Sequence, residues 1–219
     1  MMVEAIIFDM DGLMLDTENV AIVCWQKAGE QFGYTITREL MLQAIGRTVT
    51  DTKKLLLNHF GEDFPYEEAR KVRAGHTKDY IETKGIDTKE GLMDLLIYCQ
   101  NEGIPIAVAT STHRHHAESL LEKAGIKSYF NHIICGDDVS NGKPAPDIFL
   151  LASKTLGINI DQCIILEDSE NGILAASRAG AIPIWVPDLI IESNIAKQHA
   201  QYICDSLVDA KHLIEHLRE

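Results

Sequence analysis

Short apolar runs rich in β-branched residues recur along the chain, and a segment with helical periodicity follows most of them. In residues 88–101, for example, apolar side chains recur at spacings of three and four, as expected for one face of a helix. Strands that alternate with helices and are apolar through most of their length are typical of a parallel sheet covered on both faces. The sequence therefore predicts a doubly wound, Rossmann-like α/β core. The expected strands are residues 4–9, 104–110, 133–136, 163–167, 182–186 and 202–204, and the expected helices between them are residues 88–101, 113–124, 146–156 and 170–179.

The stretch from residue 16 to residue 82 interrupts this alternation, because it contains no convincing strand. One helical pattern ends at Gly33, Thr37 is placed to cap a short second helix, and residues 50–60 form a third. Pro65 is well placed to start a long fourth helix, which reaches Lys84. The sequence thus predicts an inserted α-helical domain at residues 16–82, with residues 1–15 and 83–219 forming the core.

The charge of the chain limits its partners. A formal net charge of −13 argues against nucleic acid or an anionic membrane surface, since both are bound by basic surfaces. It leaves room for a small anionic substrate held by a local positive group or a metal ion. The five cysteines are scattered without a C-x-x-C pair, which predicts buried free thiols in a reducing compartment. Without a basic leader or an 18-residue apolar run, we expect a cytoplasmic protein that does not span a membrane.

Chemically active side chains follow the ends of several expected strands. In an open parallel sheet, ligands bind outside the carboxyl ends of the strands. We therefore expect these side chains to converge on one crevice, although an acidic strand end taken alone is more often a turn or a helix cap. The residues are Asp9, Asp11, Thr110, Ser111, Lys143, Glu167 and Asp168.

The residue types at these strand ends favour phosphate chemistry. Asp9, Glu167 and Asp168 would crowd anionic oxygens together, which suits Mg²⁺. Lys143 adds a mobile positive charge, and a hydroxyl side chain at residue 110 or 111 precedes a helix start that favours an anion. Phosphoryl transfer depends mainly on positioning and charge neutralisation, and a carboxylate can serve as its nucleophile by forming an aspartyl-phosphate.

Four ordered motifs make the chain resemble the haloacid dehalogenase superfamily. They are D-x-D-G at residues 9–12, the Thr-Ser pair at 110–111, K-P-x-P at 143–146 and E-D-S-x-x-G at 167–172. The resemblance is strongest to the phosphatases and β-phosphoglucomutases that carry a helical cap after the first motif. Asp11 favours phosphoryl transfer over carbon–halogen cleavage, because the dehalogenase branch lacks this acid and needs no metal.

The resemblance implies a role for each motif. Asp9 would attack phosphorus, and Asp11 would protonate the leaving oxygen and later accept a proton from the hydrolytic water. Mg²⁺ would be held by the Asp9 carboxylate, the backbone carbonyl of Asp11 and Asp168, with Glu167 nearby or contributing.

The remaining implied contacts concern the phosphoryl group and the rest of the substrate. Thr110, Ser111 and Lys143 would bind phosphoryl oxygens. Glu18 either faces the substrate or only occupies a first helical turn, and Arg47 in a cap turn either contacts the substrate or does not.

Three functional hypotheses follow. The first is a Mg²⁺-dependent phosphatase, which we expect to be a monomer, acting on a small phosphorylated metabolite such as a sugar phosphate. The second is a phosphosugar mutase of the β-phosphoglucomutase type. That reading is weakened because the mutases' cap histidine and cap lysine fall at Ala21 and near His76. The third and weakest hypothesis is a non-catalytic binding protein.

Overall fold

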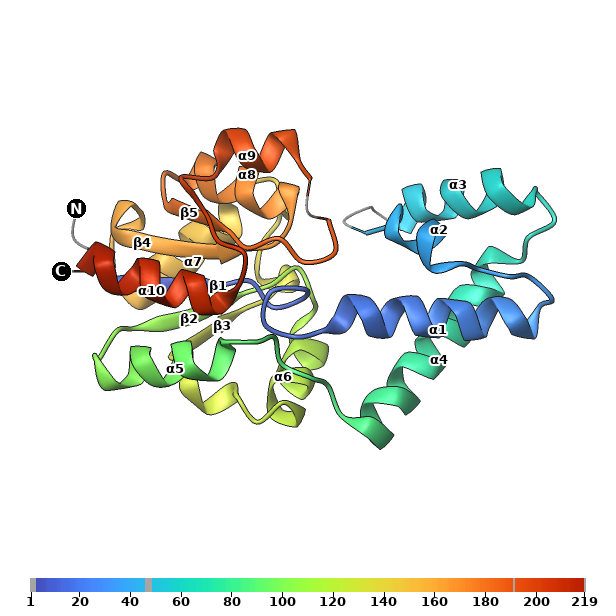
Figure 1. Ribbon diagram of the computed structural model, residues 1–219, viewed down its shortest axis with the longest axis horizontal. Coiled ribbons are helices and arrows are strands. Elements are labelled where there is room, and N and C mark those ends of the chain that lie inside the picture. The colour runs from blue at the N-terminus through green and yellow to red at the C-terminus, as the bar shows by residue number, and fades with distance from the viewer. Residues whose placement is uncertain (1–2, 46–48, 191, 219) are drawn as a thin grey trace. The chain divides into compact units, whose positions relative to one another are not determined.

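The structure is a computed structural model that describes residues 3–45, 49–190 and 192–218. The chain forms two compact units (Figure 1). One unit, the core, comprises Met1–Leu15 and Asp87–Glu219, and the other, the helical unit, comprises Asp16–Ile86.

The core contains a six-stranded parallel sheet with the strand order β3-β2-β1-β4-β5-β6. β1, β2, β4 and β5 are buried along their whole length, which explains why they read as continuous apolar runs in the sequence. The prediction of a doubly wound parallel sheet is confirmed, and the strands are up to three residues shorter than the apolar runs. Their bounds are β1 Ala5–Phe8, β2 Ile106–Ala109, β3 His132–Ile134, β4 Cys163–Glu167, β5 Ile182–Trp185 and β6 Tyr202–Ile203.

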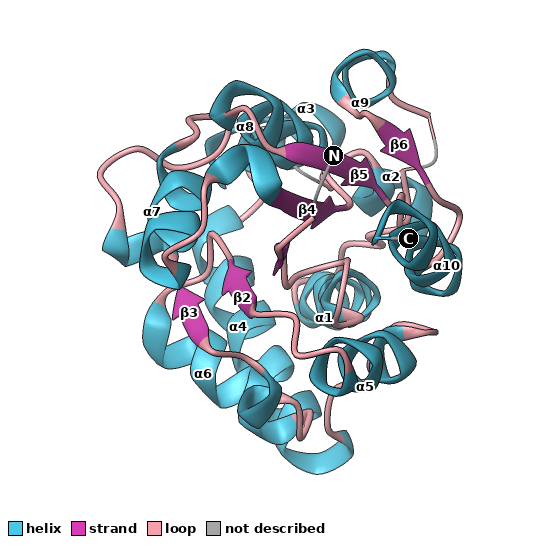
Figure 2. Cartoon of the chain, turned by 90° about the vertical axis from the view of Figure 1, so that its left-hand side faces the viewer, coloured by secondary structure: helices cyan, strands magenta, loops and turns pink. Residues whose placement is uncertain are grey.

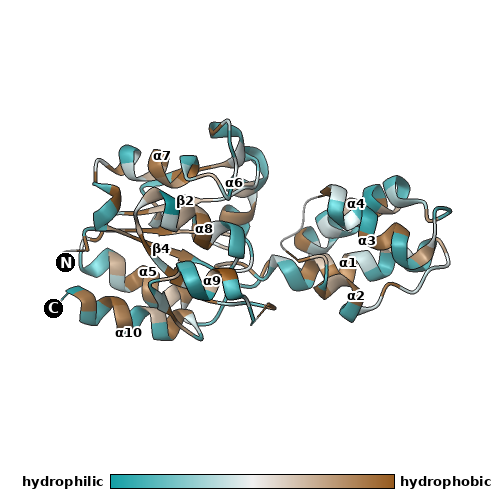
Figure 3. Ribbon diagram, turned by 90° about the horizontal axis from the view of Figure 1, so that it is seen from above, coloured by the Kyte–Doolittle hydropathy of each residue, from teal (hydrophilic) through white to brown (hydrophobic). Residues whose placement is uncertain are grey.

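Helices cover both faces of this sheet. Figure 2 shows α7, α8 and α9 on one side and α5, α6 and α10 on the other. Phe149 of α7 and the strand residues Ile7 and Ile165 are fully buried and belong to one apolar cluster. Hydrophobic residues accordingly follow the strands in Figure 3, and hydrophilic residues lie on the outward surface of helices such as α7. The helices are α5 Leu92–Asn101, α6 Arg114–Lys123, α7 Asp147–Leu156, α8 Glu170–Ala179, α9 Asn194–His199 and α10 Leu207–Arg218, with short 3₁₀ turns at Lys127–Tyr129, Gly136–Asp138 and Ile160–Gln162.

Two of these helices end as the sequence predicts. Gly157 after α7 and Gly180 after α8 adopt left-handed backbone angles, with φ of 73° and 80°. A glycine in this conformation ends a helix and turns the chain back toward the sheet without a steric penalty. These two turns lead the chain toward β4, which ends at the candidate site residue Glu167, and toward β5.

The described part of residues 16–86 contains helices and no strand. Thr37 caps the second helix as expected, because its side chain accepts a hydrogen bond from the Leu40 N–H at 3.2 Å. Trp25 of the first helix stacks on Tyr66 of the fourth, with ring centroids 5.8 Å apart. The helices are α1 Thr17–Gln31, α2 Arg38–Leu42, α3 Val49–Phe60 and α4 Tyr66–Lys84. Among the described residues, no helix of either unit is long and apolar enough to cross a bilayer.

Candidate active site

The strand order places the ends of three neighbouring strands together. β1 lies between β2 and β4 and pairs with both in register, so the residues that follow these strands leave the sheet at one edge. Asp9 follows β1, Thr110 follows β2, and Glu167 is the last residue of β4. All three polar side chains are buried, and Thr110 and Glu167 are fully so. Buried polar groups need partners, and these residues find them in one another and in their neighbours.

Lys143, in the loop before α7, connects two of these carboxylates. Its Nζ donates to Asp9 Oδ1 at 2.5 Å, to Glu167 Oε1 at 2.6 Å and to the Ala109 backbone carbonyl at 3.0 Å. The Lys143 side chain is only 6% exposed. An ammonium group has three hydrogens, so these three acceptors account for all of them. The sequence prediction that Lys143 lies among the strand-end acids therefore agrees with the geometry.

Glu167 is held from two further directions. Its Oε2 accepts hydrogen bonds from the Ser169 N–H and from the Ser169 hydroxyl, both at 2.9 Å. A Cβ atom at Gly172 would overlap the Glu167 carboxylate, so only glycine leaves room for this side chain. Both oxygens of Glu167 thus have donors within the protein, which favours a role in anchoring Lys143; its role as a metal ligand stays a prediction.

Asp9, Glu167 and Asp168 form an acidic cluster in which each offers one carboxylate oxygen within 4.8 Å of the others. Gly12, with φ of 83°, lies directly against the Asp168 carboxylate, and a Cβ at residue 12 would collide with it. With Asp11 added, four carboxylates stand at the fixed positions of motifs that contribute a single lysine. An all-oxygen donor set with excess negative charge fits a hard divalent cation such as Mg²⁺.

Burial shifts the acidity of the Asp9–Lys143 pair. Burial raises the pKa of Asp9 to about 8; the Lys143 ammonium opposes this rise, while the charges of Glu167 and Asp11 add to it. Burial alone would lower the pKa of Lys143, but Asp9 and Glu167 more than compensate and raise it above its ordinary value. The lysine therefore stays charged, and a further cation beside Asp9 would lower the pKa of this carboxyl group and keep it ionised.

Asp11 is oriented by two hydroxyl groups. Its Oδ2 accepts hydrogen bonds from Thr112 Oγ1 at 2.7 Å and from Thr110 Oγ1 at 3.3 Å. The Thr110 hydroxyl in turn accepts the Thr112 N–H at 3.1 Å. Sequence reasoning missed Thr112, although it is the third hydroxyl residue of the Thr110-Ser111-Thr112 run and thereby offered a signal.

The loop after β3 packs against the loop after β2. A Cβ at Gly136 would overlap the Ser111 carbonyl, and the Gly136 N–H donates to the Thr112 carbonyl at 3.1 Å. The Asp137 carboxylate accepts the Arg114 N–H at 2.9 Å and so occupies one donor at the start of α6. Ser111 itself is exposed, as expected of a residue that meets a ligand.

Of the two substrate contacts expected in the helical unit, the structure describes one. Glu18 lies in the first turn of α1 and borders a hollow of about 170 Å³ within that unit. Arg47 falls outside the described residues. The hollow is lined by Glu18, Ala21, Ile22, Trp25, Met41, Ala44, Ile45 and Thr52.

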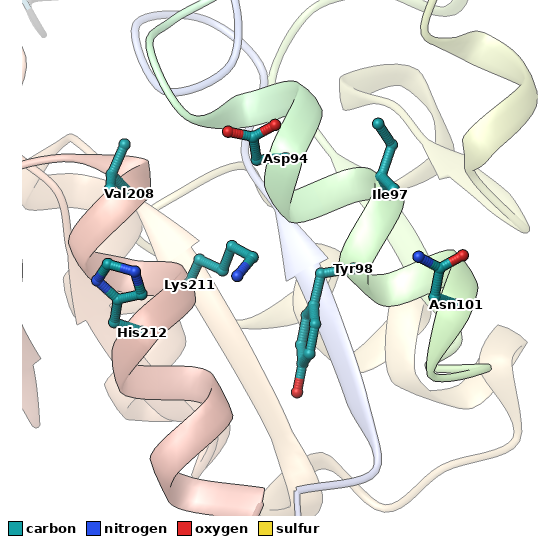
Figure 4. A pocket seen from close by; sticks show the side chains of 7 residues that line it. All are labelled: Asp94, Ile97, Tyr98, Asn101, Val208, Lys211 and His212. Atoms are coloured by element: carbon teal, nitrogen blue, oxygen red, sulfur yellow. The ribbon is translucent and has the colours of Figure 1, made fainter.

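A groove of about 360 Å³ lies elsewhere on the core, between α5 and α10 (Figure 4). It is lined by none of the strand-end motif residues. Lys211 on its wall pairs with Glu215 at 2.5 Å and lies 5.2 Å from the centre of the Tyr98 ring. Because none of the strand-end motif residues lines this groove, we do not assign it to the active site.

Comparison with known proteins identifies the family of this arrangement. The family model described as haloacid dehalogenase-like hydrolase matches residues 6–186. A probable pseudouridine-5'-phosphatase of Drosophila melanogaster is 33% identical over 94% of this chain and 90% of its own length. A beta-phosphoglucomutase of Bacillus subtilis is 31% identical over 84% of this chain and 83% of its own length.

Solved structures agree with this result. The chain is similar to CbbY from Rhodobacter sphaeroides in complex with phosphate, with a TM-score of 0.76, 27% identity and coverage of 95% of this chain and 96% of that one. Further curated relatives are named phosphatases, which confirms the expected enzyme class. The chain belongs to the haloacid dehalogenase-like hydrolases and is a phosphatase of that family.

Proposed function

We propose that this protein is a Mg²⁺-dependent phosphatase that hydrolyses monoesters of small metabolites, sugar phosphates or similar compounds, through an aspartyl-phosphate on Asp9. The observation that carries the proposal is the buried Lys143 Nζ, 2.5 Å from Asp9 Oδ1 and 2.6 Å from Glu167 Oε1, at the ends of adjacent strands. The substrate class is supported by relatives named as phosphatases of phosphorylated carbohydrates and of fructose-1-phosphate. Cytoplasmic location and a monomeric state remain predictions.

Asp9 is the proposed nucleophile. Lys143 donates to its Oδ1, which restrains the orientation of the carboxylate. A new bond forms between an Asp9 oxygen and phosphorus while the bond from phosphorus to the ester oxygen breaks. Water then attacks the phosphorus of the aspartyl-phosphate, which releases inorganic phosphate and restores the carboxylate.

Asp11 is the proposed acid and base. It donates a proton to the leaving ester oxygen in the first step and accepts one from the attacking water in the second. The Thr112 hydroxyl, bound to its Oδ2 at 2.7 Å, holds the carboxyl group in place between these steps, and the longer 3.3 Å bond from Thr110 would be exchanged when the Thr110 hydroxyl donates to a phosphoryl oxygen.

Thr110, Ser111 and Lys143 are the proposed phosphate ligands. Because all three Lys143 hydrogens already have acceptors, contact with a phosphoryl oxygen requires the exchange of one of them. The bond to the Ala109 carbonyl, at 3.0 Å, is longer than the two bonds to carboxylates, and we expect it to be the one exchanged.

The proposed metal ligands are Asp9, Asp168 and the backbone carbonyl of Asp11, with Glu167 adjacent. A bound Mg²⁺ would supply positive charge at the phosphoryl oxygens. Glu18 and Arg47 are retained as proposed substrate contacts of the helical unit.

Replacement of Asp9 by Asn tests the nucleophile. Asp9→Asn should reduce hydrolysis of p-nitrophenyl phosphate in the presence of Mg²⁺ to background, because an amide is too weak a nucleophile to attack phosphorus. Circular dichroism should show an intact fold. Retention of substantial turnover by the folded variant would disprove the assignment.

Replacement of Asp11 by Asn tests proton transfer. For an ester with a poor leaving group, such as a sugar phosphate, Asp11→Asn should slow hydrolysis by about 10²–10⁴-fold, which is the usual contribution of general acid–base catalysis. The leaving p-nitrophenolate needs little protonation, so the transfer of its phosphoryl group to the enzyme should be less affected. Phosphoenzyme should therefore accumulate during turnover and be trapped by acid quench. Thr112→Val, which removes only the 2.7 Å bond, is the control and should have a smaller effect. An equal loss for both leaving groups, without trapped phosphate, would contradict the role.

A methyl group at Gly172 tests the anchoring of Lys143. Gly172→Ala places its Cβ onto the Glu167 carboxylate, which has to leave Lys143 or Ser169. We expect a loss of about 1–3 kcal/mol in unfolding free energy, the cost of a broken buried hydrogen bond, and a fall in kcat of about tenfold or more. Gly75→Ala, in α4 with no atom within 4 Å of the new Cβ, is the matched control and should be neutral or stabilising. If both variants behave alike, the anchoring role of Glu167 is wrong.

The relation to beta-phosphoglucomutases makes transfer to a sugar the second candidate. The histidine expected in the mutases falls at Ala21 and their lysine falls near His76, so we expect transfer to water. Phosphorus NMR with β-glucose 1-phosphate and a trace of glucose 1,6-bisphosphate should show release of inorganic phosphate. Clean conversion to glucose 6-phosphate would establish the mutase instead.

A further inference from the structure

The loop that carries Asp168 is held by the end of the neighbouring strand. The Val186 N–H donates to the Glu167 carbonyl at 2.8 Å, which is the last backbone bond between β4 and the chain that follows β5. The next carbonyl, that of Asp168, accepts the Trp185 indole N–H at 2.8 Å. Two consecutive carbonyls of the acidic loop are therefore bound from the β5 side, the second by a side chain instead of the backbone.

This second bond marks the point where the chain leaves the sheet. Successive carbonyls of a strand point to opposite neighbours, and in β4 the Leu166 carbonyl accepts the Asp9 N–H from the β1 side at 3.0 Å, before the Glu167 carbonyl turns to β5. A continued strand would direct the Asp168 carbonyl back toward β1. The indole keeps this carbonyl on the β5 side, while the Asp168 carboxylate lies against Gly12 on the β1 side.

The indole is itself firmly placed. Trp185 is 1% exposed and packs with Ile173 of α8 and Ala196 of α9. The Ser193 hydroxyl accepts the Ala196 N–H at 2.9 Å and donates to Glu170 at 2.5 Å, just after the acidic loop. Figure 1 shows β4, β5, α8 and α9 as neighbours in the core. The donor that reaches Asp168 thus belongs to a rigid part of the fold.

We propose that Trp185 is a positioning residue for the metal site: its indole N–H fixes the Asp168 carbonyl and thereby sets the direction of the Asp168 carboxylate and the affinity for Mg²⁺. The inference rests on the metal role of Asp168 in the proposed function. Groups that orient metal ligands without touching the metal commonly contribute about 10–100-fold to metal affinity. The sequence motif ends before this residue, and no metal-binding side chain type marks it.

The test removes the N–H and keeps the ring. Site-specific replacement of Trp185 by β-(3-benzothienyl)alanine puts sulfur in place of the N–H at nearly constant shape, and Trp185→Phe is the simpler companion variant. Calorimetric titration with Mg²⁺ should show affinity weaker by about tenfold or more in the folded isosteric variant. Activity at saturating Mg²⁺ should return to near the wild-type kcat, while the Mg²⁺ concentration needed for half-maximal activity rises. A purely structural tryptophan would lower thermal stability without this separation.

The chain has only two tryptophans, which provides a direct signal. In ¹⁵N-labelled protein, Mg²⁺ should shift the indole N–H resonance of Trp185 at the same concentrations that saturate the calorimetric titration. Trp25 lies in the helical unit and serves as the internal control; its signal, assigned with Trp25→Phe, should not follow that titration.

The outcomes separate the inference from the proposed function. Unchanged Mg²⁺ affinity in the folded isosteric variant, with wild-type hydrolysis intact, overturns the role of Trp185 alone. Tryptophan-dependent Mg²⁺ binding in a wild-type protein that hydrolyses no phosphate monoester supports Trp185 and rejects the function. Absence of Mg²⁺ binding by the wild-type protein rejects both the metal site and the role of Trp185.

Discussion

The buried ammonium group of Lys143 is the interaction on which the rest of the site depends. Placing Asp9 and Glu167 side by side in the interior would leave two uncompensated charges, and an unpaired buried charge costs several kcal/mol. One Nζ within 2.6 Å of both carboxylates lowers this cost for each of them, although its single positive charge does not balance two negative ones. In the proposed function the same contact would orient Asp9 for attack, so stabilisation and catalysis would share one interaction.

Glycines allow the backbone and the charged groups to approach this closely. A Cβ at Gly172 would displace Glu167, one at Gly12 would displace Asp168, and one at Gly136 would displace the loop that contains Ser111. At each of these three positions, a site residue occupies the space that a side chain would otherwise fill. Gly12 of the D-x-D-G motif packs against Asp168 of the E-D-S-x-x-G motif, and Gly172 packs against Glu167 of its own motif.

The sequence predicted the sheet, the helix ends and the strand-end residues because each of these leaves a local pattern. Continuous apolar runs identify buried parallel strands, and Gly157 and Gly180 mark helix ends. The hydrogen-bond partners of the strand-end residues leave no such local pattern in the sequence. Thr112 was overlooked because its bond to Asp11 spans two strands, and Trp185 looks like any buried aromatic residue until its N–H is seen to reach a carbonyl.

Charge balance connects the fold to the chemistry. Within the core, the fixed positions of the motifs place one lysine among four carboxylates, and burial raises the pKa of Asp9 while the Lys143 ammonium opposes that rise. Lys143 cannot correct this alone, because its hydrogens are divided between Asp9, Glu167 and a carbonyl. A second cation held by Asp168 would complete the neutralisation and ionise Asp9. In the proposed function, that cation would favour the reactive form of Asp9, and the proposed orientation of Asp168 by a buried indole would therefore bear on the reaction itself.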